Sequence, residues 1–151
     1  MIHVDYIPNE FSSHEDFLVQ IPELGIGGYG DTYYFADDSG ILPYEASDTK
    51  VKIVIRALLT YWEEQVEALG VGQIAYLPFD VSDQSISLLQ VENCGSTLLA
   101  RHAWTGATGG IHVSRLDRID FSKKEIHVYE GSVRWPTEKF LAAVRRERDK
   151  L

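Results

Sequence analysis

The sequence has little of what holds small cross-linked domains together. Its 151 residues include a single cysteine, Cys94, so no disulfide can form within the chain and four-cysteine zinc sites are excluded. No stretch approaches the roughly 18 consecutive apolar residues of a transmembrane helix, and the first residues lack the basic and apolar segments of a secretory signal. We therefore expect a soluble, cytoplasmic protein.

Basic residues are nearly absent from the first third of the chain. Residues 1–50 contain ten acidic residues and one base, Lys50, whereas residues 51–151 contain 13 acids and 13 bases. The formal net charge of −9 therefore lies in the first third. Nucleic acids and anionic membranes bind basic surfaces, so neither is an expected partner. A basic protein is the expected partner, although an acidic surface can also serve only to keep a protein soluble.

No segment has the composition of a linker, a repeat or a disordered region. Apolar residues make up 44% of the chain and charged residues 25%, which is the range of ordinary globular domains. The length matches one domain over residues 1–151. No Walker loop, G-x-S-x-G or H-E-x-x-H motif is present, so we do not expect an enzyme.

Hydrophobic periodicity predicts an α+β fold. Alternation favours strands at residues 2–6 and 17–21, and a hairpin over 32–44 with its turn at 37–40. Further strands are predicted at residues 73–79, 86–92, 97–104, 111–115, 118–121 and 125–129, with a hairpin turn at 122–124. Because short turns join these strands, we expect a mostly antiparallel sheet.

Two helices complete the predicted fold. Between residues 49 and 69, apolar residues recur at helical spacing, namely Val51, Val54, Ile55, Leu58, Trp62, Val66 and Leu69. Asp48 is expected to cap the start of this long amphipathic helix, and Gly70 to end it in a left-handed conformation. A C-terminal helix is expected to begin at Pro136. The long helix should pack on one face of the sheet.

Three motifs are candidate ligand sites. The run Gly25–Gly30 matches G-x-G-x-x-G, but a strand pattern follows it instead of a helix, which favours a turn with positive φ or a mobile loop that lets Tyr29 contact a partner. His102 and His112 would face each other if residues 104–110 form a hairpin loop centred near Ala107. A zinc site would need a third ligand such as His127, so we predict no metal and no cofactor.

Asp80 and Asp83 bracket Val81 and Ser82, and paired carboxylates can hold Ca²⁺ or Mg²⁺ or share acid–base work. The glycine and terminal glutamate of an EF-hand loop are missing, so we favour a turn whose backbone N–H groups these side chains satisfy. Cys94 has no histidine beside it in the sequence, which argues against a nucleophile.

One segment resembles a known class of proteins. A long helix bearing Trp62, then Tyr-Leu-Pro-Phe-Asp-Val-Ser-Asp-Gln at residues 76–84 and Leu-Leu-Gln-Val at 88–91, is similar to small acidic bacterial immunity proteins of polymorphic or contact-dependent toxin systems. The likeness covers about residues 50–92. It implies a non-catalytic protein that neutralises a cognate toxin by stoichiometric binding, and it carries no catalytic residues. The class of toxin stays open, as does the oligomeric state.

The acidic first third supplies the predicted partner-binding residues. Asp31, Asp37, Asp38 and Glu45 are expected to provide charge, and the contact area is expected from Tyr29, Tyr33, Tyr34 and Tyr44. The alternative is a small ligand-binding or metal-binding, enzyme-like domain that uses the loop from Gly25 to Asp31 or the pair of His102 and His112.

Overall fold

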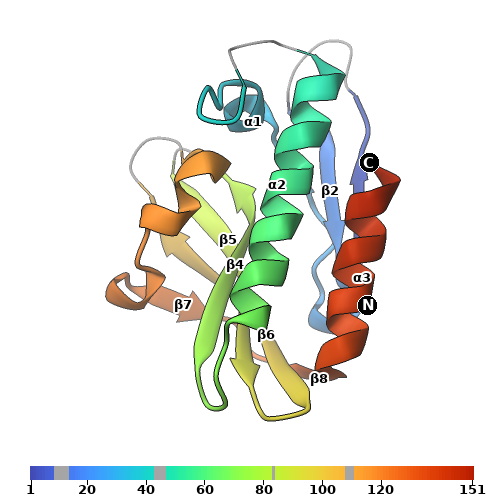
Figure 1. Ribbon diagram of the computed structural model, residues 1–151. Coiled ribbons are helices and arrows are strands. Elements are labelled where there is room, and N and C mark those ends of the chain that lie inside the picture. The colour runs from blue at the N-terminus through green and yellow to red at the C-terminus, as the bar shows by residue number, and fades with distance from the viewer. Residues whose placement is uncertain (9–13, 43–46, 83, 108–110) are drawn as a thin grey trace.

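Two antiparallel sheets and two long helices form the fold in the computed structural model, which describes residues 1–8, 14–42, 47–82, 84–107 and 111–151 (Figure 1). The strands are β1 (His3–Tyr6), β2 (Phe17–Gln20), β3 (Tyr29–Gly30), β4 (Ile74–Val81), β5 (Ser85–Asn93), β6 (Thr97–Gly106), β7 (Ile126–Val128) and β8 (Val133–Pro136). The helices are α1 (Tyr33–Ala36), α2 (Asp48–Glu67) and α3 (Thr137–Lys150). The predicted α+β class is confirmed.

The first sheet has the order β1-β2-β3 and the second β4-β5-β6-β7, with every pairing antiparallel. Strand β8 pairs with residues 97–100 of β6, and β7 pairs with residues 103–105 of the same strand. The long strand β6 therefore has two short partners in succession along one edge. β8 was not predicted, because Val133–Pro136 is short and ends in proline.

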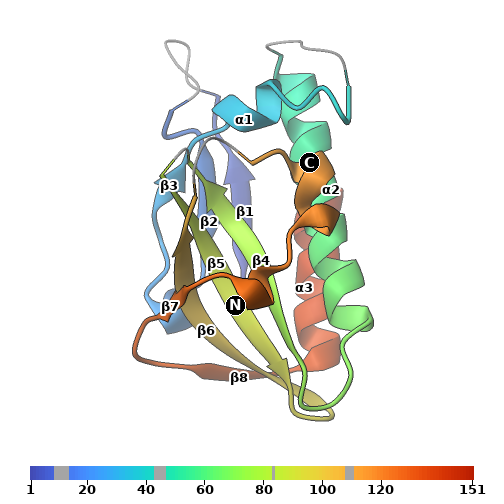
Figure 2. The same cartoon turned by 90° about the vertical axis from the view of Figure 1, so that its left-hand side faces the viewer.

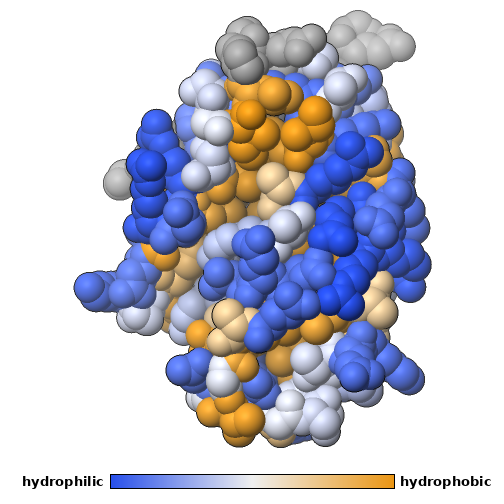
Figure 3. All heavy atoms as spheres, in the orientation of Figure 1, coloured by the Kyte–Doolittle hydropathy of each residue, from blue (hydrophilic) through white to orange (hydrophobic). Residues whose placement is uncertain are grey.

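The two helices lie side by side against the sheets. In Figure 2 the second sheet stands in front of β1 and β2, with α2 and α3 along one side and α1 across the upper end. Hydrophilic residues gather over α3 and the adjoining part of α2 (Figure 3), where Arg145 pairs with Glu63 at 2.5 Å and with Glu67 at 2.7 Å. None of the helices in the described ranges has the length and apolar character of a membrane span.

Helix α2 confirms the predicted helix, with different residues at its ends. Ser47 is the N-cap, since its hydroxyl accepts the Lys50 N–H at 3.2 Å. Asp48 lies in the first turn, where a carboxylate is favoured by the positive end of the helix dipole. The prediction that Asp48 caps the helix was wrong by one residue.

The end of α2 also differs from the prediction for Gly70. The helix ends at Glu67, and the left-handed glycine of this turn is Gly72, with φ of 81°. Gly70 instead donates its N–H to the side-chain oxygen of Gln73 at 2.8 Å. The side-chain amide of Gln73, one residue after the left-handed Gly72, thus closes the turn.

Trp62 lies at the centre of the core, as its place in the helical stripe predicts. Its side chain is fully buried, and the indole N–H donates to the Pro78 carbonyl of β4 at 2.8 Å. Val54, Ile55 and Leu58 are buried on the same face of α2. This face therefore carries both buried apolar side chains and a hydrogen bond to the second sheet.

The predicted hairpin over residues 32–44 is wrong where the structure describes it. Residues Tyr33–Ala36 form one helical turn, α1, and residues 37–42 form turns. The turn buries Phe35 edge-on against Phe17, with ring centroids 5.4 Å apart. Local β propensity is overridden here because one helical turn lets Phe35 reach the core. Residues 43 and 44 lie outside the described residues.

Two of the predicted short strands are also wrong. Val113–Arg118 and Phe121–Lys123 are 3₁₀ helices, whereas β7 confirms the strand predicted at 125–129. Val113 and Leu116 are both buried, and a 3₁₀ helix places residues three apart on one side. The apolar spacing in this segment was therefore helical and too short to recognise.

We expect Trp62→Ala to lower the free energy of unfolding by about 3–5 kcal/mol, because it leaves a cavity and removes the partner of the Pro78 carbonyl. Denaturant unfolding measures the loss. Glu64→Ala, on the exposed face of the same helix, is the control and should change stability by no more than about 0.5 kcal/mol. Equal effects of the two substitutions would contradict the packing described for α2.

Candidate functional site

Three of the predicted partner-binding residues gather around one surface hollow of about 250 Å³. The hollow is lined by residues from three segments: His14, Asp31, Tyr33, Tyr34, Val81 and Ser82. Val81 is the last residue of β4 and Ser82 follows it, about 50 residues further along the chain. The first third of the chain and the second sheet therefore meet at this hollow.

Buried hydrogen bonds hold the segment that carries these residues. The carboxylate of Asp16 is buried and accepts the Thr32 N–H at 3.1 Å and the Thr32 hydroxyl at 2.5 Å. Burial raises the pKa of Asp16, although both bonds from Thr32 favour its ionised form. Asp31 and Tyr33 are the neighbours of Thr32 in the chain, so the hydrogen bonds between Asp16 and Thr32 also hold their backbone in place.

Asp31 lies at the rim with its carboxylate already hydrogen-bonded on one side. It accepts the Glu15 N–H at 2.9 Å and lies 2.9 Å from Nδ1 of His14. The hydrogen bond to Asp31 and its negative charge raise the pKa of His14. Asp31 therefore favours the protonated form of His14.

The tyrosines differ in how much surface they offer. Tyr29 and Tyr33 are 53% and 55% exposed, whereas Tyr34 is half-buried. The ring of Tyr34 lies edge-on to Tyr33 at 5.1 Å and tilted to His112 at 6.5 Å. Tyr34 therefore supports the exposed ring of Tyr33 from behind.

Asp37 and Asp38 have opposite roles although they are neighbours. Asp37 is exposed and lies 3.2 Å from Nε2 of His112. Asp38 is fully buried and accepts the backbone N–H and the hydroxyl of Ser114, at 2.9 and 2.5 Å, and the Gly40 N–H at 3.2 Å. The prediction that Asp38 supplies surface charge was wrong, because its carboxylate anchors the loop to the segment after β6.

Five of the eight predicted residues thus form one exposed or half-exposed region, which we call the acidic tyrosine surface: Tyr29, Asp31, Tyr33, Tyr34 and Asp37. Tyr44 and Glu45 lie outside the described residues.

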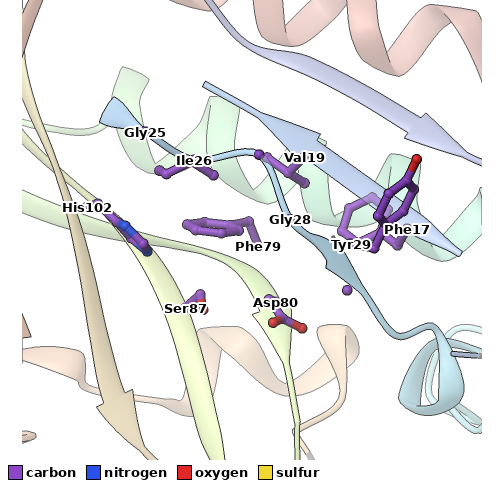
Figure 4. A pocket seen from close by; sticks show the side chains of 12 residues that line it. Phe17, Val19, Gly25, Ile26, Gly28, Tyr29, Phe79, Asp80, Ser87 and His102 are labelled. Atoms are coloured by element: carbon purple, nitrogen blue, oxygen red, sulfur yellow. The ribbon is translucent and has the colours of Figure 1, made fainter. Parts of the chain in front are cut away.

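A second depression, the inter-sheet cleft, adjoins this surface and has a volume of about 200 Å³ (Figure 4). One wall is β2 with the glycine loop, and the other comes from β4, β5 and β6; the lining residues are Phe17, Val19, Gly25, Ile26, Gly27, Gly28, Tyr29, Gly30, Phe79, Asp80, Ser87 and His102. Gly25 has φ of 68°, which confirms the predicted turn with positive φ, and the loop leads into β3 rather than into a helix.

A β-bulge makes this cleft polar. The pairing of β4 with β5 shifts between Pro78 and Asp80, so that Phe79 has no partner in the register. Successive strand residues normally point to opposite faces, but a bulge redirects them. Phe79 and Asp80 therefore both line the cleft, with Phe79 between His102 and Asp80 in Figure 4.

Three polar side chains converge on the cleft: Asp80, Ser87 and His102. Within the described part of the chain, none of the three has a side-chain hydrogen bond or ion pair. Burial raises the pKa of Asp80, the charge of Asp31 raises it further, and burial lowers the pKa of His102. The sequence does not indicate that these three residues lie together, because they come from three strands. Its only local sign of the bulge is the proline before Phe79 and Asp80.

The predicted pairing of His102 with His112 is wrong. In the register His102 lies opposite Leu89, and its ring is 4.3 Å from that of Tyr129, whereas His112 contacts Asp37 and Tyr34. The partners of β6 on this side are β7 and β8 rather than a strand at 111–115. Among the described residues, no cluster of three or more His, Cys, Asp or Glu side chains has the arrangement of a metal site.

The turn after β4 is built by Ser82, whose hydroxyl accepts the Ser85 N–H at 3.1 Å and donates to the Ser85 carbonyl at 3.0 Å. Asp80 lines the cleft instead of the turn, and Asp83 lies outside the described residues. The predicted turn is confirmed, but the predicted role of Asp80 in it is wrong. Cys94 lies half-buried in the turn between β5 and β6.

Comparison with known proteins gave no relative: no protein-family model, curated protein or solved structure matches the chain.

We expect Asp38→Ala to destabilise the fold by about 1–3 kcal/mol, because it leaves Ser114 and Gly40 donors without their acceptor. Asp37→Ala is the matched control, with the same change at the adjacent position, and should lie within about 0.5 kcal/mol of the wild type. Thermal unfolding of both variants tests the assignment. A larger loss for Asp37→Ala would reverse the roles given to the two carboxylates.

Proposed function

We propose that this chain is a non-catalytic immunity protein that acts in the bacterial cytoplasm and neutralises a basic toxin domain by stoichiometric binding. The observation that carries the proposal is the acidic tyrosine surface, where exposed carboxylates and exposed tyrosines share one region of the molecule. The resemblance of residues 50–92 to immunity proteins supports the same conclusion. Those residues supply most of α2, all of β4 and most of β5.

Charge supports a basic partner. Among the described residues, the only ion-pair partner of Asp31 or of Asp37 is a histidine, and Asp80 lies nearby without an ion pair. By contrast, Glu63 and Glu67 of α2 form ion pairs with arginines of α3. Asp31 and Asp37 thus give this region negative charge, and a negative field accelerates the encounter with a basic protein.

The aromatic residues support protein binding. Tyrosine is enriched at binding hot spots, because it buries a large area at a small entropic cost and retains a hydrogen-bonding group. Tyr29 and Tyr33 are exposed on either side of Asp31, and Tyr34 supports Tyr33. The segment therefore offers a partner two exposed aromatic side chains that flank a carboxylate in the sequence.

The surface is also held in place before binding. The buried carboxylates of Asp16 and Asp38 fix the chain on both sides of α1 through hydrogen bonds to Thr32 and Ser114. A pre-organised surface loses little conformational entropy when the partner binds. Tight, rigid binding is what stoichiometric inhibition of a toxin requires.

Reversal of two charges should weaken binding through the association rate. A basic protein captured from the source cells is identified by mass spectrometry and purified, and its binding is measured by surface plasmon resonance. Asp31→Lys together with Asp37→Lys should slow association at least about tenfold at low salt, because the steering field is inverted. Wild-type association should also slow as salt shortens the screening length from about 10 Å at 0.1 M to about 3 Å at 1 M.

The matched control is Glu130→Lys together with Glu138→Lys, which makes the same change in net charge at exposed sites near β8. This control should retain binding and retain protection of cells that express the toxin. Undiminished binding and protection by the first double variant would refute the proposed surface.

Truncation of Tyr33 should change the dissociation rate instead of the association rate. Tyr33→Ala removes buried contact area without changing the charge, so the dissociation rate should rise about tenfold or more while the association rate stays nearly constant. Val71→Ala is the control, since Val71 is 76% exposed in the turn between α2 and β4, at the end of α2 away from α1. An unchanged dissociation rate for Tyr33→Ala would remove Tyr33 from the interface.

A further inference from the structure

The inter-sheet cleft adjoins the acidic tyrosine surface at Tyr29 and Gly30. Tyr29 lines the cleft and belongs to that surface. At Gly30 the strands come so close that an added Cβ would lie 2.9 Å from the Asp80 carboxylate oxygen. A partner seated on the acidic tyrosine surface therefore covers the mouth of the cleft.

The cleft has the chemistry of a site for a planar cation. Asp80 and Asp31 place negative charge at one end, and the described residues contain no cation paired with Asp80. The ring of Phe79 lies beside this carboxylate, and the face of an aromatic ring attracts cations. Ser87 and His102 add further hydrogen-bonding atoms at the other side.

We propose that the inter-sheet cleft receives an arginine side chain of the basic partner, an inference that rests on the proposed function. The guanidinium group donates to the carboxylate of Asp80 and to the hydroxyl oxygen of Ser87, and it stacks on Phe79. An arginine fits better than a lysine, because its planar group donates in two directions at once, is weakly hydrated and stacks on aromatic rings. The bulge that turns Phe79 and Asp80 to the same side creates this combination.

The test of this site uses Asp80→Asn, and we expect this variant to fold. The pKa of Asp80 is raised in the folded protein, so its carboxylate binds a proton more readily in the folded state than in the unfolded state. Ionised Asp80 therefore lowers stability at neutral pH, and Asp80→Asn should preserve or raise the unfolding midpoint there. The amide keeps the size of the side chain and removes only its charge.

Titration with N-acetyl-arginine N-methylamide, followed by NMR of the isotope-labelled protein, tests the cleft without any partner. We expect saturable shifts at Phe79, Ser87 and His102, weaker shifts with the lysine analogue, and none with the citrulline analogue, which has the same shape but no charge. Asp80→Asn should weaken arginine binding at least about tenfold, since it removes a charge-assisted hydrogen bond. Asp117→Asn, at an exposed site on the Val113–Arg118 helix, should leave it unchanged.

The captured partner provides the second measurement. Asp80→Asn should raise its dissociation constant at least about tenfold, and replacing one arginine of the partner should abolish that difference in a double-mutant cycle. If charge reversal of the acidic tyrosine surface weakens the partner but Asp80→Asn does not, the proposed function stands and the arginine site is wrong. Binding of the free arginine analogue without any effect of Asp80→Asn on the partner would likewise overturn it, in favour of a small-molecule site.

Discussion

The contact between Trp62 and Pro78 is the one on which the rest of the structure depends. The buried indole joins α2 to β4 through a hydrogen bond of 2.8 Å, at the last paired residue before the bulge. Pro78 has no N–H to donate and lies in an outer strand of its sheet, where proline is tolerated. With β4 held at this point, the extra residue of the bulge is taken up by Phe79, and Asp80 is turned into the inter-sheet cleft. The helix packing and the polarity of the cleft therefore share one cause.

The carboxylates of the first third include buried ones, which hold loops in place, and surface ones, which a partner can reach. Asp16 and Asp38 are buried, and each accepts backbone and hydroxyl donors that fix the loops around α1. Asp31 and Asp37 remain at the surface beside histidines. Negative charge in this region thus serves two purposes, since the buried acids shape the surface on which the exposed acids act. The net charge of a segment does not distinguish them, because burial depends on donors such as Ser114 that are 76 residues away.

Whether an element could be predicted depends on the range of the interactions that form it. The helical stripe around Trp62, the meander from β4 to β6 and the C-terminal helix were predictable, because their periodicity lies within each segment. The segment Tyr33–Ala36 was mistaken for a strand, since its aromatic residues favour strands locally while Phe35 is buried against Phe17 from β2. The pairing of His102 with His112 failed for a related reason: it assumed a strand at residues 111–115, whereas Val113–Arg118 is a 3₁₀ helix and β6 pairs with β7 and β8.

The sequence by itself determined the α+β class, the register of α2 and the concentration of negative charge before Lys50, because each is a property of composition or of spacing along the chain. Only the tertiary structure decided which carboxylates are exposed, and that Asp80, Ser87 and His102 line one cleft with the glycine loop. Those three residues lie on three strands, and one of them is turned inward by a bulge. Their proximity depends on strand pairing and on burial, which involve residues far apart in the chain and leave no pattern in the sequence.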